Sequence, residues 1–374
     1  MTPDMQEVQP SVPLTSALYN GFMTRLIQTI STGERWYQWA FGPAPDVGLA
    51  PTFIKSYSCR PSLSVRIFCP STWDSTSSQR LPCYFNIHGG GFCLGMPEDD
   101  DMWNRAFADR HGILVVELDY RKAPAYPFPT AIHDVEALML AVYGDEAVPL
   151  DRQRIAVGGS SSGGNLALGV CQLPSIRDAV KPSAVCPIYP LVDLATKAEK
   201  KAKMRYYKPE LGSGMRANAT DMLSPVSGFF GWSYLPYGQH LRDPLLSPIY
   251  APREHLPKKV FIIAAELDRL AHEAWRMASV LAHRPEPAPD MKVGQKDPGT
   301  PGQLMLDDER FAFEHVDDNS GEVVRWLLVP DQIHGFDLEP EGFHGSEDAF
   351  RDARLKTETY QIILGNWLHK FAWS

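Results

Sequence analysis

The chain has 374 residues, enough for one large α/β domain with additions or for two domains, and its 44% hydrophobic and 11% aromatic content can bury a sizeable core. A formal net charge of -9 at pH 7, with no long run of Lys or Arg, argues against a nucleic-acid partner. The N-terminus is polar and acidic rather than signal-like, and no apolar run approaches the ~20 residues that a membrane span needs.

The six cysteines stand singly and show no C-x-x-C spacing, which argues against both a disulfide framework and a zinc site. Most lie within apolar, strand-like runs. Reduced, buried thiols fit a cytoplasmic protein, so we expect that location and no metal. The cysteines are Cys59, Cys69, Cys83, Cys93, Cys171 and Cys186.

The first 50 residues contain a helical pattern from Leu18 to Ile30, followed by an aromatic segment from Trp36 to Phe41. A helix with this much aromatic surface must cover something, and we expect it to lie over the mouth of a pocket. Residues 54–59 and 63–69 alternate in polarity and are split by a turn, which predicts an antiparallel pair of strands.

From residue 82 onwards, apolar strand-like runs alternate with helix-compatible segments. This alternation predicts a parallel sheet covered by helices on both faces. Residues 195–250 break the rhythm and are interpreted as part of a lid, while residues 284–321 have little periodicity and predict a long, irregular surface insertion. The strands are expected at 82–87, 113–118, 155–157, 184–189, 259–264 and 323–329, and the helices at 98–111, 127–143, 166–170, 271–283 and 348–371.

Residues 154–165 run from an apolar strand through glycines and three serines into a helix-compatible segment. The pattern G-x-S-x-G fits only one register, with Gly159 and Gly163 on either side of Ser161. A strand that turns directly into a helix brings backbone against backbone, so only small residues fit at the two flanking positions. We therefore predict a nucleophile elbow with Ser161 at its apex.

A serine hydroxyl needs a base to become a nucleophile, and a histidine base needs a carboxylate to fix its tautomer. His334 follows the last predicted strand by a short turn, and Asp268 follows the strand at 259–264. Residues just beyond the carboxyl ends of parallel strands face one crevice, so these two are expected to meet Ser161. Glu266 is a rival for the acid, and Asp331 a weaker one; Asp268 could instead cap the helix that follows it.

The transition state of acyl transfer carries an oxyanion, which needs preorganised hydrogen-bond donors. The segment His88-Gly-Gly-Gly-Phe92 can supply the N–H groups of Gly90 and Gly91, joined by the N–H of Ser162. A nucleotide-binding loop is the alternative, but the G-x-G-x-x-G and Walker patterns are absent. His88 itself is expected to have a structural role in holding this loop.

These motifs together resemble the hormone-sensitive-lipase-like (HGGG-type) branch of the α/β-hydrolases. The resemblance covers residues ~50–374 and rests on motifs that occur in the family's order. They are His88-Gly-Gly-Gly-Phe92, Asp119-Tyr-Arg-Lys-Ala-Pro124 with Pro127-Phe-Pro129, Gly159-Ser-Ser-Ser-Gly-Gly-Asn165, Asp243-Pro-Leu-Leu-Ser-Pro248, Ala265-Glu-Leu-Asp268 and His334-Gly-Phe336.

The resemblance implies an α/β-hydrolase fold with a mostly parallel, eight-stranded sheet and a helical cap. Residues 1–50 and 195–240 would form the cap, and residues 51–194 and 241–374 the core, with the insertion at 284–321. It implies a carboxylesterase without cofactor, acting on a small to medium-sized apolar ester, with Gly90, Gly91 and Ser162 as oxyanion donors. An exposed sheet edge could support a homodimer.

Three features depart from the family pattern. Ser160 and Ser162 replace the usual Asp and Ala around the nucleophile, Ala125 replaces the usual Glu after Ala-Pro, and the insertion at 284–321 separates the acid from the base. The first two remove carboxylates near the site. Two alternatives to ester hydrolysis therefore stay open: an acyltransferase or cyclase of specialised metabolism that uses the same triad, and a non-catalytic small-molecule receptor.

Overall fold

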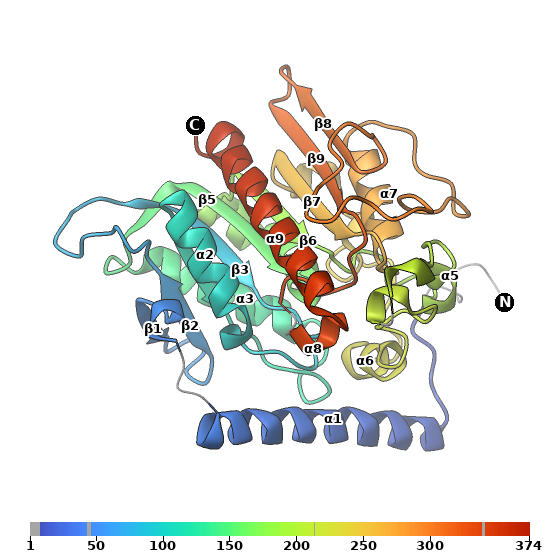
Figure 1. Cartoon of the computed structure of the whole chain (residues 1–374). Coiled ribbons are helices and arrows are strands. Elements are labelled where there is room, and N and C mark those ends of the chain that lie inside the picture. The colour runs from blue at the N-terminus through green and yellow to red at the C-terminus, as the bar shows by residue number, and fades with distance from the viewer. Residues whose placement is uncertain (1–7, 43–45, 213, 339–340) are drawn as a thin grey trace.

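The computed structural model describes residues 8–42, 46–212, 214–338 and 341–374. Within these ranges the chain builds one nine-stranded sheet in the order β1-β2-β4-β3-β5-β6-β7-β9-β8 (Figure 1). The strands are β1 (Phe53–Ser56), β2 (Ser64–Phe68), β3 (Leu81–Ile87), β4 (Leu114–Leu118), β5 (Leu150–Ser160), β6 (Ala184–Ile188), β7 (Lys259–Ala265), β8 (Ala312–Asp317) and β9 (Glu322–Val329).

The strands from β4 to β9 in this order pair in parallel, whereas β1, β2 and β8 run antiparallel to their neighbours. The predicted antiparallel pair at the N-terminal side of the sheet corresponds to β1 and β2. Because the parallel strands all end at one edge, the loops after β3, β5, β7 and β9 gather there.

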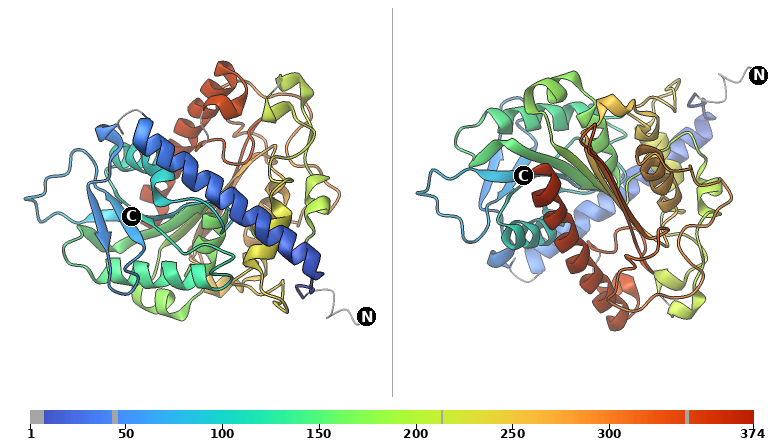
Figure 2. Two further views of the ribbon diagram at one scale, coloured as in Figure 1. Left: turned by 90° about the horizontal axis from the view of Figure 1, so that it is seen from below. Right: turned by 90° about the horizontal axis from the view of Figure 1, so that it is seen from above.

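Helices cover both faces of the sheet, as predicted (Figures 1 and 2). Cys83 and Phe85 of β3 join the core under one set of helices, and Tyr84 between them joins the core under the other set. This alternation explains why the strand sequences are apolar throughout. One face carries α3 (Thr130–Gly144), α4 (Ser162–Cys171) and α7 (Ala271–Leu281), and the other α2 (Asp101–His111) and α9 (Glu347–Trp367).

The strand number differs from the eight that the resemblance implied, because part of the 284–321 segment is a strand. Residues 312–317 form β8, which pairs along its whole length with β9. Phe313 is buried while Glu314 is exposed, so the strand does alternate. It is only six residues long and stands among Pro, Gly and Asp, which hid the pattern in the sequence.

The predicted cap regions lie together over the carboxyl edge of the sheet. The N-terminal part is a single long helix, α1 (Leu14–Phe41), followed by a short turn at Val47–Leu49; the second part contains α5 (Ala198–Ala202) and α6 (Ser227–Tyr234). Helix α1 packs on α6 and runs along one side of the molecule (Figures 1 and 2). A four-residue helix, α8 (Glu341–His344), precedes α9. No described helix is both long and apolar enough to cross a bilayer.

Candidate active site

Ser161 stands at a sharp turn between β5 and α4, in the conformation expected of an elbow. Its φ of 55° and ψ of -116° are strained for a residue with a side chain, and its N–H is held by the Ile188 carbonyl at 2.9 Å. A Cβ at Gly159 would lie 2.5 Å from the Ile87 carbonyl oxygen, and one at Gly163 only 1.8 Å from it. The two flanking glycines are therefore required by β3, which passes beside the turn.

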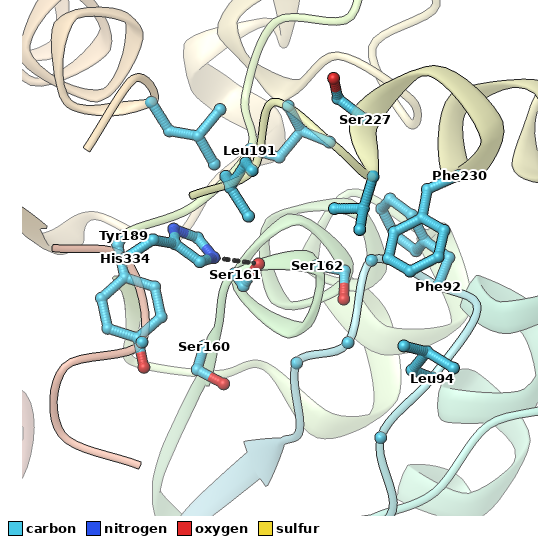
Figure 3. A pocket seen from close by; sticks show the side chains of 18 of the residues that line it. Phe92, Leu94, Ser160, Ser161, Ser162, Tyr189, Leu191, Ser227, Phe230 and His334 are labelled. Atoms are coloured by element: carbon cyan, nitrogen blue, oxygen red, sulfur yellow. Dashed lines mark hydrogen bonds between the residues drawn. The ribbon is translucent and has the colours of Figure 1, made fainter. Parts of the chain in front are cut away.

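His334 and Asp268 converge on Ser161 from two other strand ends, and Figure 3 shows the hydrogen bond between His334 and Ser161. The Nε2 atom of His334 lies 2.7 Å from Ser161 Oγ, and its Nδ1 atom lies 2.7 Å from Asp268 Oδ2. A neutral imidazole with its proton on Nδ1 donates to Asp268 and accepts from the serine hydroxyl. The other oxygen of Asp268 accepts from the Leu270 N–H at 2.9 Å, so this residue also caps the turn before α7.

The electrostatic surroundings of His334 favour its protonated form. Burial, the largest single influence, lowers the pKa of this imidazole, but the charge and hydrogen bond of Asp268 together with the charges of Asp221 and Asp337 outweigh it, and the net pKa is raised. The ring can therefore stabilise the positive charge that it acquires when it accepts a proton. Such an environment suits a general base.

The two rival carboxylates are committed elsewhere, in a buried ion cluster around Lys208. The Nζ atom of Lys208 lies 2.8 Å from Glu266 Oε2 and 2.7 Å from Asp331 Oδ1. Glu266 also accepts from the N–H groups of Asp331 and Gln295. This cluster joins the loop after β7, the loop after β9 and the cap, so that of the three candidate carboxylates Asp268 is the one that contacts His334.

The glycine loop after β3 borders the same cavity as Ser161. Gly90 and Gly91 have φ values of 111° and 60°, and a Cβ at Gly91 would lie 2.5 Å from Phe230 Cδ2 of α6. Among the described residues, none accepts a hydrogen bond from the N–H of Gly90 or Gly91. Ser162 is the first residue of α4, where helix N–H groups lack partners within the helix.

His88 lies behind the loop in a set of contacts that fix its orientation. Its Nδ1 atom donates to the Gly89 carbonyl at 2.7 Å, and its ring stacks on Tyr120 with centroids 4.5 Å apart. Burial and the charge of Lys122 lower the pKa of His88, so the ring is neutral and its Nε2 can accept from Lys122 Nζ at 3.2 Å. Through Nδ1 the ring thus holds the backbone of the glycine loop.

The two unusual serines differ in their surroundings. Ser162 Oγ lies 3.3 Å from the Tyr120 hydroxyl. The Ser160 hydroxyl is buried, points away from the Ser161–His334 bond (Figure 3) and has no hydrogen-bond partner among the described residues. Neither hydroxyl takes part in the Ser161–His334–Asp268 chain of hydrogen bonds.

Several residues of the site were not predicted. Tyr189 lies at the end of β6, packs edge-on against His334 with centroids 4.8 Å apart, and donates from its hydroxyl to Asp337 at 2.6 Å. The half-buried Asp337 comes two residues after the His-Gly motif, and that proximity was the available signal. Arg269 follows Asp268 directly; its N–H donates to Asp221 at 3.0 Å, and its side chain reaches the Ala198 carbonyl at 2.6 Å.

A cavity of about 810 Å³ opens above Ser161 and His334. Its size lies in the upper range of small-molecule sites. Most of the wall is apolar and comes from the cap and from the loops after β6 and β7, including Leu191, Met222, Val226, Phe230 and Leu270. Within the described residues, no cluster of three or more His, Cys, Asp or Glu side chains is placed to hold a metal ion.

Helix α1 contributes Ser31 and Arg35 to the cavity wall. The aromatic surface that we expected to cover the pocket instead faces outward, with Trp36 60% and Trp39 83% exposed. The helix thus borders the cavity through polar side chains, contrary to the expectation from its composition.

Comparison with known proteins places these features among characterised relatives. A family model described as alpha/beta hydrolase fold matches residues 84–290. An arylesterase of Saccharolobus solfataricus is 30% identical over 213 residues, which cover 56% of this chain and 63% of that protein. Arylacetamide deacetylase of Oryctolagus cuniculus is 36% identical over 138 residues, or 34% of this chain and 33% of that protein.

The matched regions thus span less than two thirds of the length of these curated relatives. Among solved structures, an esterase of Pyrobaculum calidifontis superposes with a TM-score of 0.63 at 21% sequence identity, covering 96% of this chain and 99% of that chain. At this identity the likeness concerns the fold.

Proposed function

The chain belongs to the hormone-sensitive-lipase-like branch of the α/β-hydrolases, and on that premise we propose that it is a serine carboxylesterase. The observation that carries this proposal is the unbroken chain of hydrogen bonds from Ser161 through His334 to Asp268, with both links at 2.7 Å. This geometry is what acyl transfer through a serine nucleophile requires.

In the proposed mechanism, Ser161 Oγ attacks the ester carbonyl while His334 Nε2 takes the serine proton. The N–H groups of Gly90, Gly91 and Ser162 stabilise the oxyanion of the tetrahedral intermediate. His334 then gives its proton to the leaving alcohol, and an acyl-enzyme remains. Water, deprotonated by the same imidazole, attacks the acyl carbonyl, and collapse of the second intermediate frees the carboxylic acid and Ser161. Asp268 holds the imidazole and stabilises its charged form throughout.

The cavity supports an apolar ester of small to medium size as substrate. Its wall is formed mainly by aliphatic and aromatic side chains, and Phe230 stands directly beside Gly91, so that it limits the space next to the reacting carbonyl. The relatives named arylesterase and arylacetamide deacetylase agree with an ester or amide as substrate.

The cysteines support a reducing compartment such as the cytoplasm. All six are free thiols, and five of them are buried. Burial raises the pKa of these thiols, that of Cys69 to about 11 and that of Cys93 to about 12, so they are unreactive at neutral pH.

A pair of neighbouring serines gives a matched test of the nucleophile. Ser161→Ala should lower kcat for p-nitrophenyl esters by about 10⁶-fold and abolish labelling by a fluorophosphonate. Ser160→Ala removes a hydroxyl one residue away that has no hydrogen-bond partner in the described part of the chain, and it should keep both activity and labelling. A wild-type protein that neither hydrolyses a panel of such esters nor reacts with the probe, or labelling that persists in Ser161→Ala, would overturn the proposal.

A further inference from the structure

The one buried side chain of helix α1 and the side chains that bind it to the core and to α6 by hydrogen bonds are small or polar. Thr24 is its one buried residue, and the Thr24 hydroxyl lies 2.9 Å from the Ser233 hydroxyl of α6. Gln28 donates to the carbonyls of Cys93 and Ala123 at 2.9 and 2.8 Å, and Gly21 lies against Trp232. A surface helix usually turns its apolar face to the core, so this helix is docked the opposite way round.

The outward side of α1 carries an exceptional concentration of large apolar side chains. Of the 24 large hydrophobic residues that are exposed in the described chain, ten lie on this one helix. At ~100° per residue they fall on roughly half of the helix circumference. We call this set the outer face of α1; it consists of Leu14, Leu18, Tyr19, Phe22, Leu26, Ile30, Trp36, Tyr37, Trp39 and Phe41, with exposed fractions from 39% to 83%.

The chemistry of the outer face indicates what covers it. Only three of the 28 residues of α1 are charged, Arg25, Glu34 and Arg35, and Arg35 is paired with Asp99 at 2.9 Å. Four of the ten outer residues are Trp or Tyr, which are enriched where a protein meets the headgroup region of a bilayer. An uncharged face on a protein of net charge -9 has no attraction to anionic lipid, which favours a neutral lipid surface.

The shape of the molecule points the same way. Helix α1 is straight, ~42 Å long by its 28 residues, and forms one side of the molecule, so a plane can touch its whole length (Figures 1 and 2). A second copy packed on α1 would follow one ridge of side chains and leave much of this wide face exposed. A flat, deformable lipid surface can cover all of it.

We propose that the outer face of α1 binds in the plane of a neutral lipid surface, with its aromatic side chains in the headgroup region. Ser31 and Arg35 of the same helix line the cavity above Ser161, so the bound lipid would lie beside the entrance to the site. An apolar ester dissolved in the lipid then reaches the cavity without crossing water. That last step rests on the proposed esterase activity, whereas the lipid contact does not.

The test measures binding separately from catalysis. Full-length Ser161→Ala protein is floated with small sonicated vesicles of phosphatidylcholine, and tryptophan quenching by brominated phosphatidylcholine reports insertion. We expect binding that changes little with salt. Adding Phe22→Ser, Trp36→Ser and Trp39→Ser should weaken the partition constant at least ~100-fold, because each fully buried aromatic side chain contributes roughly ten-fold.

Two further exposed positions provide a matched control. Tyr237→Ser and Leu306→Ser remove side chains that are 78% and 51% exposed but lie outside α1, and they should leave the partition constant unchanged. Equal melting temperatures would show that the triple variant is folded. The proposal is wrong if the unsubstituted face does not bind vesicles or if the triple variant binds equally well. A dimer seen by sedimentation velocity without vesicles, and lost in the triple variant, would assign the face to a second copy instead.

Discussion

The carboxyl edge of the sheet and the cap above it are held by different kinds of contact. At the edge, Asp268, His334 and Glu266 are buried, and each makes a short polar contact to a partner from another segment. In the cap, α1 buries one threonine and meets α6 at Thr24 and Gly21. The edge holds the side chains of Ser161, His334 and Asp268 at hydrogen-bonding distance from one another, whereas the cap encloses the cavity above them.

This difference suggests a division of labour between the two regions. Catalysis by a triad depends on geometry of better than an ångström, which requires buried and mutually supporting polar groups. Selection of an apolar substrate requires a wall of suitable size and only a few fixed atoms. Substitutions at the edge should therefore change the rate or the stability, and substitutions in the cap should change which substrate is preferred.

After loss of the nucleophile itself, the largest effect is expected from Asp268→Asn at the edge. Loss of the carboxylate should lower kcat by about 10⁴-fold, because the imidazole loses the partner that fixes its tautomer. His334 must be neutral to act as a base, so wild-type activity should fall as the pH drops through its raised pKa. Without Asp268, burial is the dominant influence on the pKa of His334 and lowers it.

The pH dependence of kcat/KM measures this shift. The acidic limb of Asp268→Asn should move to lower pH than that of the wild type, although the remaining rate is small. An acidic limb at the same pH in both proteins would contradict the assignment of Asp268 as the partner of His334.

Lys208→Met should cost about 3–5 kcal/mol in the free energy of unfolding, since it leaves Glu266 and Asp331 buried without their cation. Burial raises the pKa of Glu266 even with Lys208 present. A carboxyl group with a raised pKa favours the folded state at low pH and loses that contribution as the pH rises. Urea unfolding at several pH values should therefore show a cost that shrinks as the pH falls.

The exposed Lys197 supplies the control for this experiment. Lys197→Met should change the unfolding free energy by less than about 0.5 kcal/mol at every pH. A similar cost for both variants would mean that the loss of positive charge, rather than the buried cluster, is responsible.

Gly91→Ala tests the point where the edge and the cap meet. The added methyl group would lie 2.5 Å from Phe230 Cδ2, at a residue with a φ of 60°, and the displaced loop should lower kcat by about 10²–10³-fold. Steady-state kinetics of the double variant with Phe230→Ala separates the two causes. Partial recovery would identify the contact with the cap, and no recovery would identify backbone strain.

Phe230→Ala alone should have the smallest effect on the rate and the clearest effect on selectivity. The enlarged space beside Gly91 should favour bulkier over shorter acyl groups by roughly ten-fold in the ratio of kcat/KM values. Tyr237→Ala, in the cap but outside the cavity wall, should leave this ratio unchanged. An unchanged ratio in Phe230→Ala would mean that the cap does not select the acyl group.

Much of the fold could be predicted from the sequence, because strand polarity and motif order are local properties. The family and the two-sided parallel sheet are confirmed, and the structure brings Ser161, Asp268 and His334 together; their roles stay predictions until tested. Glycine spacing identified Ser161 because the two residues that lie too close to β3 to carry a Cβ, Gly159 and Gly163, are each only two positions from it in the sequence.

What could not be predicted depends on contacts between distant segments. Lys208 is 58 residues from Glu266 and 123 from Asp331, and nothing near it in the chain marks it as buried. The outward orientation of α1 depends on its packing against α6, a segment about 200 residues away. The hydrophobic pattern of α1 alone does not show which of its sides meets α6. Strand β8 was missed because its six residues show too few alternations of polarity to stand out among the Pro, Gly and Asp residues around them.

Arg269 couples the cap to the loop that carries Asp268, so the two segments cannot be exchanged independently between relatives. Its backbone is the next link of the chain after Asp268, while its N–H is held by Asp221 of the cap and its guanidinium by the Ala198 carbonyl. A cap transplanted from a relative would bring its own substrate preference. It would also leave Arg269 without the groups that accept its hydrogen bonds. Recombination at the boundaries of residues 195–240 should succeed only when the donor supplies a carboxylate at the position of Asp221.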